Sequence, residues 1–367
     1  MNVTAIHQLV AGFSRGDAIS NEAVVMRDMF RRWGYAADIF CERKRVLPEL
    51  RPEARDVDDL PAVLASEDVA LLHLSIGSRA NLIFRGLTSR KVLLYHNITP
   101  PAYFRLIQPR TACDLELGRE QAASLASAAT VNLADSRFNA EELAAMGYPS
   151  AAVLPLVIDF GRLHSPPDRR TLKRFQDGKR NILFVGRCAP NKKIEDVISA
   201  FACFQKAVEP NSRLIFAGSY AGTERYHRLL VSMARDLRLE DVLFLGSVSQ
   251  ADLNACYRAA HVFLCMSEHE GFCIPLVEAL FHGVPVLAYA AGAVPETLGG
   301  GGVLFHEKHF ESVAEMLGRL AESGPLRAGV LRRQAECLRR YVERDPEAEL
   351  RRHLAPFLGQ GPGVRSN

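Results

Sequence analysis

The sequence has little that would place it in a membrane, on nucleic acid or in an oxidising compartment. No uninterrupted apolar run is long enough to span a bilayer, and the start of the chain lacks the basic and apolar regions of a signal peptide. The net charge of +3 is too small to indicate nucleic-acid binding. The eight cysteines show no metal-ligand spacing, and several lie in apolar runs, where a reduced cysteine is a small core residue. We therefore expect a cytoplasmic protein that does not bind nucleic acid.

What the sequence contains is typical of two ordinary globular domains. Its 367 residues exceed the usual size of one domain, and 48% of them are hydrophobic and 24% charged. Strand and helix signals alternate along most of the chain, which predicts parallel sheets with helices on both faces. No Gly-x-Gly-x-x-Gly fingerprint follows the first predicted strand, which counts against a nicotinamide dehydrogenase.

Hydrophobic periodicity predicts the individual elements of the first half and the recurrence of the same scheme in the second. In the first half we expect helices over residues 21–33, 122–128 and 140–146, and strands over residues 35–40, 69–74, 92–95 and 130–133. The alternation starts again at residue 181, and the chain from residue 327 should be helical. We expect the tail, residues 359–367, to be disordered.

The most informative stretch is EGFCIPLVEAL, residues 270–280, which follows an apolar run that reads as a buried parallel strand. Pro275 suits the first turn of a helix, because it loses a donor that would be unpaired there. Glu270 would then lie on the loop at the carboxyl end of the strand, and Glu278 about one turn into the helix. The unpaired backbone N–H groups between these two carboxylates would suit an anion.

This arrangement resembles the Glu-x7-Glu signature of the retaining group 1 (family 4) glycosyltransferases, which have the GT-B fold. Residues 184–187 and 190–192 resemble the strand and turn that carry an Arg-x4-Lys pair in that family. Residues 153–159 resemble the segment that joins its two domains. The resemblance covers roughly residues 12–305 and is more specific in the second half of the chain.

The resemblance implies an α/β protein with two Rossmann-like domains whose parallel sheets face a central cleft. The N-terminal domain, on the acceptor side, would cover residues 1–157. The C-terminal domain, on the side of the nucleotide-sugar donor, would cover residues 158–345. Residues 346–367 would form a final helix that crosses back to the first domain and ends in a flexible tail.

The resemblance also implies roles for charged residues of the second domain. Arg187 and Lys192 would neutralise the negative charge that grows on the leaving diphosphate. Glu270 would face the hydroxyls of the donor sugar, and Glu278 would accept hydrogen bonds from the ribose. The remaining donor contacts implied there are Gly186, Gly271, Phe272, Cys273 and Ile274. The family usually has a glycine in place of Cys273, so a side chain narrows the loop at this position. Solvated loop and helix positions are the alternative for Arg187, Lys192 and Glu278. Glu268 is the rival of Glu270, and we expect it to be a solvated loop residue.

In the first domain the resemblance concerns four residues. His96 follows the predicted strand 92–95 and resembles the family histidine that contacts the donor sugar, with a structural histidine as the alternative. Gly16 and Asp17 resemble the glycine loop that approaches the diphosphate and the acceptor. Ser136 either caps the helix that follows it or faces the acceptor, and we favour the cap.

We expect no obligatory metal and no cofactor apart from the donor substrate. Residues 56–58, Asp-Val-Asp, superficially match the Asp-x-Asp motif of metal-dependent glycosyltransferases that have a different fold. They lie in a charged segment just before Pro61, and a solvated helix start explains them better. Arg187, Lys192 and a helix N-terminus would then take the place of the cation.

The expected function is retaining transfer of a hexose from a GDP- or UDP-linked sugar, with a leaning toward GDP-mannose. The acceptor would be a saccharide or a lipid-linked hydroxyl in bacterial polysaccharide synthesis, such as that of lipopolysaccharide O-antigen. A non-catalytic sugar-nucleotide-binding module and a GT-B-fold epimerase are the alternatives. Five arginines of the first domain either contact anionic lipid at the inner face of the cell membrane or form a solvated basic face: Arg31, Arg32, Arg79, Arg85 and Arg90.

Overall fold

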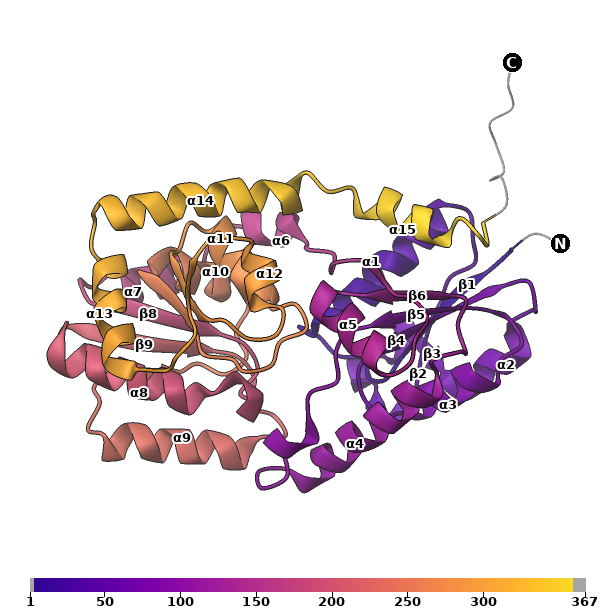
Figure 1. Ribbon diagram of the computed structural model, residues 1–367, viewed down its shortest axis with the longest axis horizontal. Coiled ribbons are helices and arrows are strands. Elements are labelled where there is room, and N and C mark those ends of the chain that lie inside the picture. The colour runs from indigo at the N-terminus through magenta and orange to yellow at the C-terminus, as the bar shows by residue number, and fades with distance from the viewer. Residues whose placement is uncertain (1–2, 359–367) are drawn as a thin grey trace, which may run out of the picture. The chain divides into compact units, whose positions relative to one another are not determined.

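The computed structural model describes residues 3–358, which divide into two compact units (Figure 1). Of the described residues, unit 1 contains 3–101, 110–157 and 345–358. Unit 2 contains Ala102–Pro109 and Ile158–Arg344. The short segment Ala102–Pro109 was expected in the first domain, but it packs with unit 2. The predicted disordered tail, residues 359–367, lies outside the described residues.

Unit 1 is built around a seven-stranded parallel sheet with the strand order β3-β2-β1-β4-β5-β6-β7. This is the doubly wound dinucleotide-binding order 3-2-1-4-5-6 with one further strand at the edge. Its strands are β1 (Ile6–Val10), β2 (Ile39–Cys41), β3 (Ala54–Asp56), β4 (Val69–Leu74), β5 (Arg90–Tyr95), β6 (Val131–Ala134) and β7 (Ala152–Val153). Its α-helices are α1 (Ala18–Arg32), α2 (Leu60–Val63), α3 (Arg79–Gly86), α4 (Pro109–Ser124), α5 (Arg137–Ala145) and α15 (Pro346–Leu354).

Unit 2 is built around a six-stranded parallel sheet with the order β10-β9-β8-β11-β12-β13, which is again 3-2-1-4-5-6 when counted along the unit. Its strands are β8 (Arg180–Val185), β9 (Ser212–Ala217), β10 (Val242–Phe244), β11 (Val262–Cys265), β12 (Val286–Tyr289) and β13 (Val303–Phe305). Its α-helices are α6 (Phe160–His164), α7 (Arg169–Phe175), α8 (Ile194–Ala207), α9 (Glu224–Asp236), α10 (Gln250–Ala259), α11 (Ile274–Phe281), α12 (Val294–Leu298), α13 (Phe310–Ala321) and α14 (Pro325–Val342).

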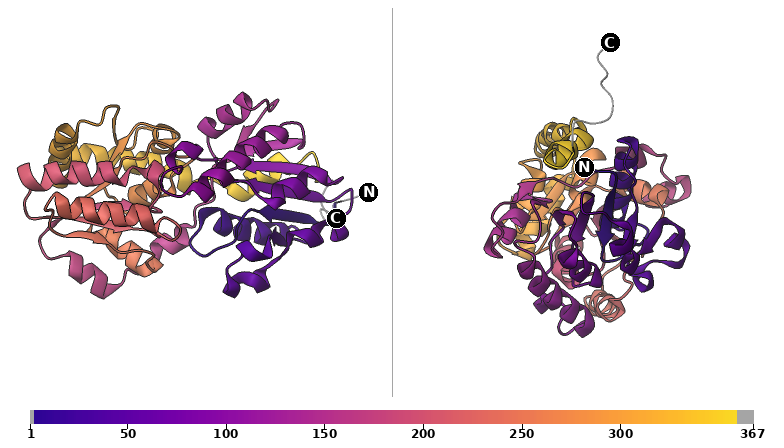
Figure 2. Two further views of the ribbon diagram at one scale, coloured as in Figure 1. Left: turned by 90° about the horizontal axis from the view of Figure 1, so that it is seen from below. Right: turned by 90° about the vertical axis from the view of Figure 1, so that its right-hand side faces the viewer.

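Each sheet is buried on both faces, which explains why the strands read as continuous apolar runs. In unit 2, Ile182 and Phe184 of β8 join the core beneath α8, α9 and α13, whereas Leu183 joins the core beneath α7, α10 and α11. Figure 2 shows the helices around this sheet from two further directions. Successive side chains of a strand point to opposite faces, so one apolar run supplies both cores.

The last helix, α15, belongs to unit 1 although 187 residues of unit 2 precede it in the chain, from Ile158 to Arg344. Leu350 and Leu354 join the core that also contains Phe30 and Trp33 of the α1 region. Glu347 accepts a hydrogen bond from the indole N–H of Trp33 at 2.6 Å. The helix is therefore an integral part of the first unit's core.

Several predicted elements agree with the structure. The strand predicted over residues 35–40 coincides with β2 only at residues 39–40, and one predicted helix is wrong. The strand predicted over residues 69–74 is β4, and the helix predicted over residues 21–33 is α1, shifted by a few positions. The helix predicted over residues 122–128 is instead α4, which starts at Pro109. The first part of this helix was not predicted, because it contains Gly118 and glycine disfavours a helix interior. A Cβ at Gly118 would lie 2.5 Å from the backbone nitrogen of Gly77, so the glycine permits close packing. None of the helices within residues 3–358 is long and apolar enough to cross a membrane.

Candidate functional site

The predicted site residues of unit 2 lie at the point where its strand order reverses. Strands β8 and β11 are hydrogen-bonded neighbours, yet the chain turns to opposite sides of the sheet after them. In open α/β sheets ligands bind outside the carboxyl ends of such a strand pair. The loop after β8 carries Gly186, Arg187 and Lys192, and the loop after β11 carries Glu270 and leads into α11.

Lys192 and Glu270 bind each other directly. The lysine Nζ lies 2.6 Å from Oε1 and 2.5 Å from Oε2 of Glu270. The side chains of Glu270 and Lys192 are only 6% and 20% exposed. Burial disfavours the ammonium, but the charge of Glu270 outweighs this and raises the pKa of Lys192. The two residues were expected to contact different parts of a ligand, whereas in the structure they form one ion pair.

The backbone of the Glu270 loop is held by contacts that the sequence analysis did not predict. The N–H of Ala293 donates to the carbonyl of Glu270 at 2.9 Å, and a Cβ at Gly292 would lie 2.6 Å from that same oxygen. Asn191 binds the backbone of residues 268–269 through its side-chain amide and its carbonyl. The loops after β8, β11 and β12 thus fix the carboxylate in place.

Glu278 is buried in α11 beside a tyrosine that the sequence analysis missed. The hydroxyl of Tyr257 donates to Oε2 of Glu278 at 2.8 Å. Burial raises the pKa of Glu278, and the bond from Tyr257 opposes this rise. Burial also raises the pKa of Tyr257 well above its usual range, so the tyrosine stays protonated and donates. Oε1 of Glu278 makes no hydrogen bond within residues 3–358 and is left as an acceptor.

Cys273 stands immediately before α11 in the left-handed region, with φ of 73°, and its side chain does not cap the helix. This conformation favours glycine, the residue that the family usually has in place of Cys273. Within the described part of the chain, the N–H groups of Cys273 and Ile274 have no acceptor, as expected for a helix start. The thiol of Cys273 also forms a hydrogen bond with that of Cys265, which lowers the pKa of Cys265 and raises that of Cys273.

The remaining residues predicted to bind the donor differ in how accessible they are. Phe272 is buried, and its ring packs edge-on against Tyr341 with centroids 6.0 Å apart, so it serves as a core side chain. Arg187 is exposed, and a single long hydrogen bond joins its Nη2 to a backbone carbonyl. Gly186 has φ of 152°, and a Cβ at Gly218 would lie 1.8 Å from its carbonyl oxygen. Gly218 therefore has to be a glycine, although the sequence analysis did not place it in the site.

Glu268 was expected to be a solvated loop residue, and this expectation is wrong. Its Oε1 lies 2.7 Å from Nζ of Lys308, and its Oε2 accepts a hydrogen bond from Tyr103 at 3.2 Å. Burial opposes the ionised carboxylate, but Lys308 outweighs it and lowers the pKa of Glu268. No sequence pattern links these three residues, because they come from segments that lie far apart in the chain.

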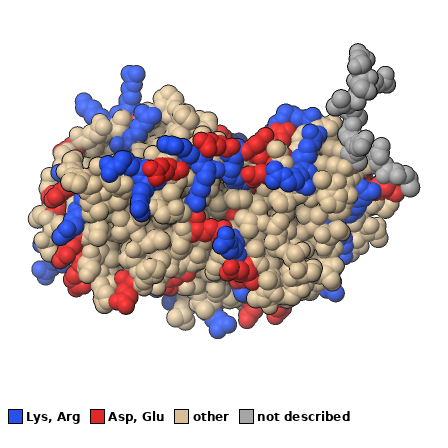
Figure 3. Space-filling view, turned by 45° about the horizontal axis from the view of Figure 1, so that its top comes forward, with Lys and Arg blue, Asp and Glu red and all other residues tan. Residues whose placement is uncertain are grey.

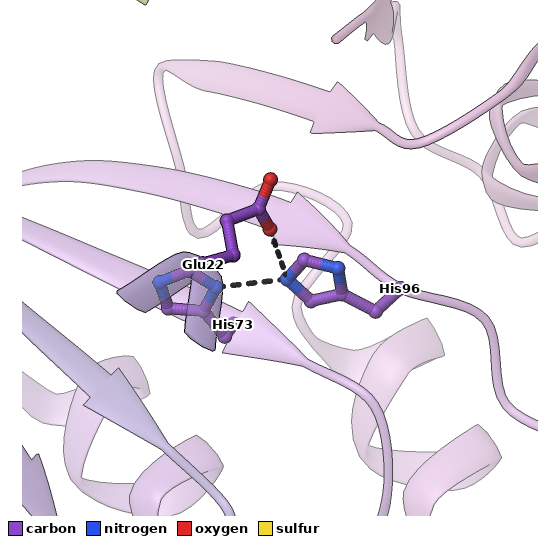
Figure 4. A group of neighbouring side chains, drawn as sticks. All are labelled: Glu22, His73 and His96. Atoms are coloured by element: carbon purple, nitrogen blue, oxygen red, sulfur yellow. Dashed lines mark hydrogen bonds and ion pairs between the residues drawn. The ribbon is translucent and has the colours of Figure 1, made fainter. Parts of the chain in front are cut away.

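In unit 1, the side chain of His96 is 1% exposed, and one of its ring nitrogens faces both His73 and Glu22 (Figure 4). Its Nε2 lies 2.8 Å from Nδ1 of His73 and its Nδ1 lies 3.0 Å from Oδ2 of Asp135. Glu22 approaches the same Nε2 at 3.7 Å. A ligand would have to replace one of these bonds to reach a ring nitrogen of His96, so direct contact with a sugar stays a prediction.

The hydrogen-bond network assigns the protons of the two histidines. The amide nitrogen of Gln8 donates to a backbone carbonyl, so its Oε1 is left to accept from Nε2–H of His73. Burial lowers the pKa of His73 well below its usual value, which leaves its Nδ1 as an acceptor for Nε2–H of His96. Burial disfavours a charged His96 too, but Asp135 outweighs it and raises the pKa of His96. A proton is therefore held between His96 and Asp135.

The other residues singled out in unit 1 mainly stabilise helix starts. Asp17 caps α1 by accepting from the backbone N–H and the hydroxyl of Ser20. Ser136 caps α5 by accepting from the N–H of Asn139, as favoured from the sequence. Gly16 is exposed and has φ of 72°, so it permits the turn into α1.

Three of the five arginines considered for lipid binding are paired with carboxylates. Arg31 pairs with Asp38, Arg79 with Asp58, and Arg32 with Glu347 of α15. Figure 3 shows basic and acidic side chains interspersed over the face that it displays. These pairs indicate that the five arginines form a solvated basic face rather than a surface that binds lipid.

Comparisons with known proteins give the family to which the second half of the chain is similar. Residues 168–334 match the family model for glycosyl transferases group 1. The chain is 30% identical over 132 residues to an O-antigen chain mannosyltransferase B from Escherichia coli, covering 36% of this chain and 34% of that protein. It is 34% identical over 116 residues to a GDP-mannose-dependent alpha-mannosyltransferase from Mycolicibacterium smegmatis, covering 32% of this chain and 27% of that one. The chain thus spans about a third of the length of these relatives.

Solved structures match nearly the whole chain in fold. HepE from Anabaena, crystallised with UDP and glucose, superposes with a TM-score of 0.74 over 96% of this chain and 98% of that one, at 16% identity. A sucrose-phosphate synthase from Thermosynechococcus elongatus superposes with a TM-score of 0.73 over 96% and 99%, at 15% identity. These matches confirm the GT-B fold predicted from the sequence, and the family match confirms the group 1 resemblance.

Proposed function

We propose that this chain, whose residues 168–334 match the group 1 glycosyl transferases, is a retaining glycosyltransferase that moves a hexose from a nucleoside-diphosphate sugar to an acceptor hydroxyl. The observation that carries the proposal is the geometry at the β8–β11 reversal. There a buried Lys192–Glu270 pair and the unoccupied Oε1 of Glu278 flank the helix start of α11. The acceptor would be a saccharide or a lipid-linked glycan in bacterial polysaccharide synthesis, on the cytoplasmic side of the membrane.

The charges of this site suit departure of a nucleoside diphosphate. Negative charge grows on the leaving phosphate, and Arg187, Lys192 and the helix start of α11 would stabilise it without an obligatory metal or a further cofactor. Glu270 would orient the sugar hydroxyls, and its bond to Lys192 would hold its carboxylate in place. Glu278 would accept from the ribose through Oε1, while Tyr257 holds its other oxygen. In this scheme Glu270 is an orienting group, and the leaving phosphate guides attack on the same face of the sugar.

GDP-mannose and a UDP-linked hexose are the two donors that the comparisons favour. Two relatives are named as mannosyltransferases, one of them GDP-mannose-dependent, and HepE was crystallised with UDP and glucose. Both donors present the same diphosphate to Arg187 and Lys192, so the choice between them depends on the base and the sugar.

Calorimetric titration of the full chain with UDP, GDP and ADP, with and without magnesium, tests the proposal. We expect one nucleotide to bind without magnesium and Lys192→Ala to lose that binding. Lys193→Ala is the matched control, because Lys193 is the adjacent lysine and pairs with Glu195 at the surface. Failure of all three nucleotides to bind would refute a nucleotide-sugar site.

Turnover with the sugar of the bound nucleotide then tests the chemistry. Retention predicts that the new glycosidic bond has the anomeric configuration of the donor, which NMR of the product reads directly. Nucleotide binding without any transfer or donor hydrolysis would instead favour a non-catalytic binding module, the alternative that Cys273 at the helix start favours.

A further inference from the structure

We propose that Cys265, Glu270 and Cys273 form a binding site for a thiophilic divalent cation of the zinc class, and that the bound cation inhibits the transferase. Two groups of histidine, cysteine or acidic side chains within residues 3–358 bring three ligand atoms within 4.8 Å of one another. One is this group, and the other is Glu22, His73 and His96. The two differ in how strongly their nitrogen or sulfur atoms are already hydrogen-bonded.

The histidine group is an internal hydrogen-bond network. Its two facing nitrogens share a hydrogen bond of 2.8 Å, and the outer nitrogens bind Gln8 and Asp135. A cation there would have to break the bond between His73 and His96. In the thiol group, by contrast, the sulfurs are joined only by weak hydrogen bonds between themselves and to Ser267.

The spacing of the thiol group suits tetrahedral coordination. With metal–sulfur bonds of about 2.3 Å, two thiolates on one zinc ion lie about 3.8 Å apart. The ligand atoms of Cys265, Cys273 and Glu270 are already within 4.8 Å of one another, so small side-chain movements bring them into place. Three protein ligands leave a fourth position for water or for the hydroxyl of Ser267, which lies 3.4 Å from Sγ of Cys265.

The charges also balance in this site. Two thiolates and one carboxylate carry three negative charges, of which a divalent cation neutralises two. The Lys192 ammonium, which contacts both oxygens of Glu270, neutralises the third. Glu270 can give one oxygen to the cation and keep the other on Lys192. Thiolate ligands select zinc or cadmium over magnesium, which prefers an all-oxygen shell.

Inhibition follows from the position of the site and rests on the proposed function. Glu270 is the carboxylate that would orient the donor sugar, and Cys273 begins the helix start that would face the diphosphate. A cation bound to both residues withdraws one carboxylate oxygen and adds bulk where the donor would lie. The cation site itself does not depend on that function, since its ligands are present whatever the enzyme transfers.

The test is a titration of the full-length protein, reduced and freed of metal by a chelator, with Cd²⁺ and with Zn²⁺. We expect one equivalent to bind and Cd²⁺ to produce an ultraviolet thiolate-to-metal charge-transfer band, whereas Mg²⁺ gives no heat. Cys273→Gly and Cys265→Ala should each weaken binding on the order of a hundredfold and abolish the band. Cys273→Gly suits the left-handed backbone, so it preserves the fold, which a thermal melt verifies.

Cys113→Ala is the matched control, because Cys113 is an exposed free thiol of unit 1. It should bind Cd²⁺ as the unaltered protein does. A charge-transfer band that persists in Cys273→Gly, or no band in the unaltered protein, would overturn the cation site.

Activity forms a separate arm of the same experiment. Zn²⁺ at one equivalent should lower turnover at least tenfold, and a chelator should restore it. Binding of Zn²⁺ with unchanged turnover would overturn the inhibition while leaving the site in place. A protein that binds Cd²⁺ but transfers no sugar would contradict the proposed function alone, so the two proposals fail separately.

Discussion

Units 1 and 2 have the same strand order, but they differ in where their polar side chains lie at the point where that order reverses. In unit 1 the strands β1 and β4 carry Gln8 and His73 within their own length, and the two side chains bind each other inside the sheet. In unit 2 the strands β8 and β11 end first, and Lys192 and Glu270 follow them on loops. Polar groups inside a strand must find partners in the protein, whereas groups beyond the strand ends can exchange theirs for a ligand.

This difference predicts which of the two units contributes mainly to stability and which contributes mainly to ligand binding. In the network of unit 1, both ring nitrogens of each histidine are hydrogen-bonded within the protein, so we expect the network to affect mainly stability. The site of unit 2 combines an ion pair, an unpaired carboxylate oxygen and free N–H groups, so its first effect is on binding and turnover. Four changes test this division, from the largest expected effect to the smallest.

Asp135→Ala should destabilise unit 1 by about 3 kcal/mol, because removing one member of a buried pair leaves His96 without its partner. Chemical denaturation followed by circular dichroism measures the effect. Asp58→Ala, which removes an exposed carboxylate paired with Arg79, is the control and should cost less than about 1 kcal/mol. Equal losses in the two variants would show that the network of unit 1 is not specially stabilising.

Lys192→Ala should lower turnover on the order of a hundredfold, the usual effect of removing one group that stabilises transition-state charge. Steady-state kinetics with the donor identified by calorimetry measures it. Lys193→Ala should stay within about threefold of the unaltered enzyme, since it removes only a surface pair. Similar losses in both variants would contradict a specific role for Lys192.

Tyr257→Phe should weaken nucleotide binding about tenfold, because a hydrogen bond to a charged group contributes roughly 1.5–3 kcal/mol. Calorimetry with the preferred nucleotide gives the ratio. Tyr226→Phe is matched to it, as Tyr226 is another buried tyrosine of unit 2 that donates to a glutamate, Glu195. A drop confined to Tyr226→Phe would mean that Glu278 does not bind the ribose.

The histidines of unit 2 should make its stability fall in mild acid. Burial lowers the pKa of His261 to about 4, while the unfolded chain has the ordinary value of 6.5. The unfolded state therefore binds more protons between these values, so stability is complete above pH 6.5 and falls toward pH 4. His282 has the same shift, also through burial, and adds to the effect.

His261→Asn isolates one part of this dependence. The backbone N–H of Asn181 donates to Nδ1 of His261, and an asparagine oxygen can accept the same bond without titrating. Thermal melts at pH 7 and pH 5 should show that the variant loses about 1 kcal/mol less than the unaltered protein. An equal loss of stability in both proteins would show that His261 does not contribute to the pH dependence. His96 of unit 1 should show the opposite sign, because its raised pKa makes its contribution decline as the pH rises.

The predictions from sequence succeeded where a local pattern determines the outcome. The continuous apolar run of β4 and the spacing from Glu270 to Glu278 need only neighbours in the chain, and the structure has the expected strand and loop–helix there. The prediction for α4 failed because of Gly118. This glycine is explained only by its close packing against Gly77, which lies in a different segment of the chain. Glu268 was misread for a similar reason, since its partner Lys308 lies 40 residues away.

The residue pattern alone predicts the alternation of strands and helices, the resemblance to the group 1 signature and the edge of the sheet at which the candidate site lies. The tertiary structure decided which groups bind each other: Lys192 with Glu270, Tyr257 with Glu278, and Cys265 with Cys273. Strand and helix periods follow from backbone geometry, which each segment carries within itself. Hydrogen-bond partners depend on the distance between segments that only folding brings together, and no spacing in the sequence encodes that distance.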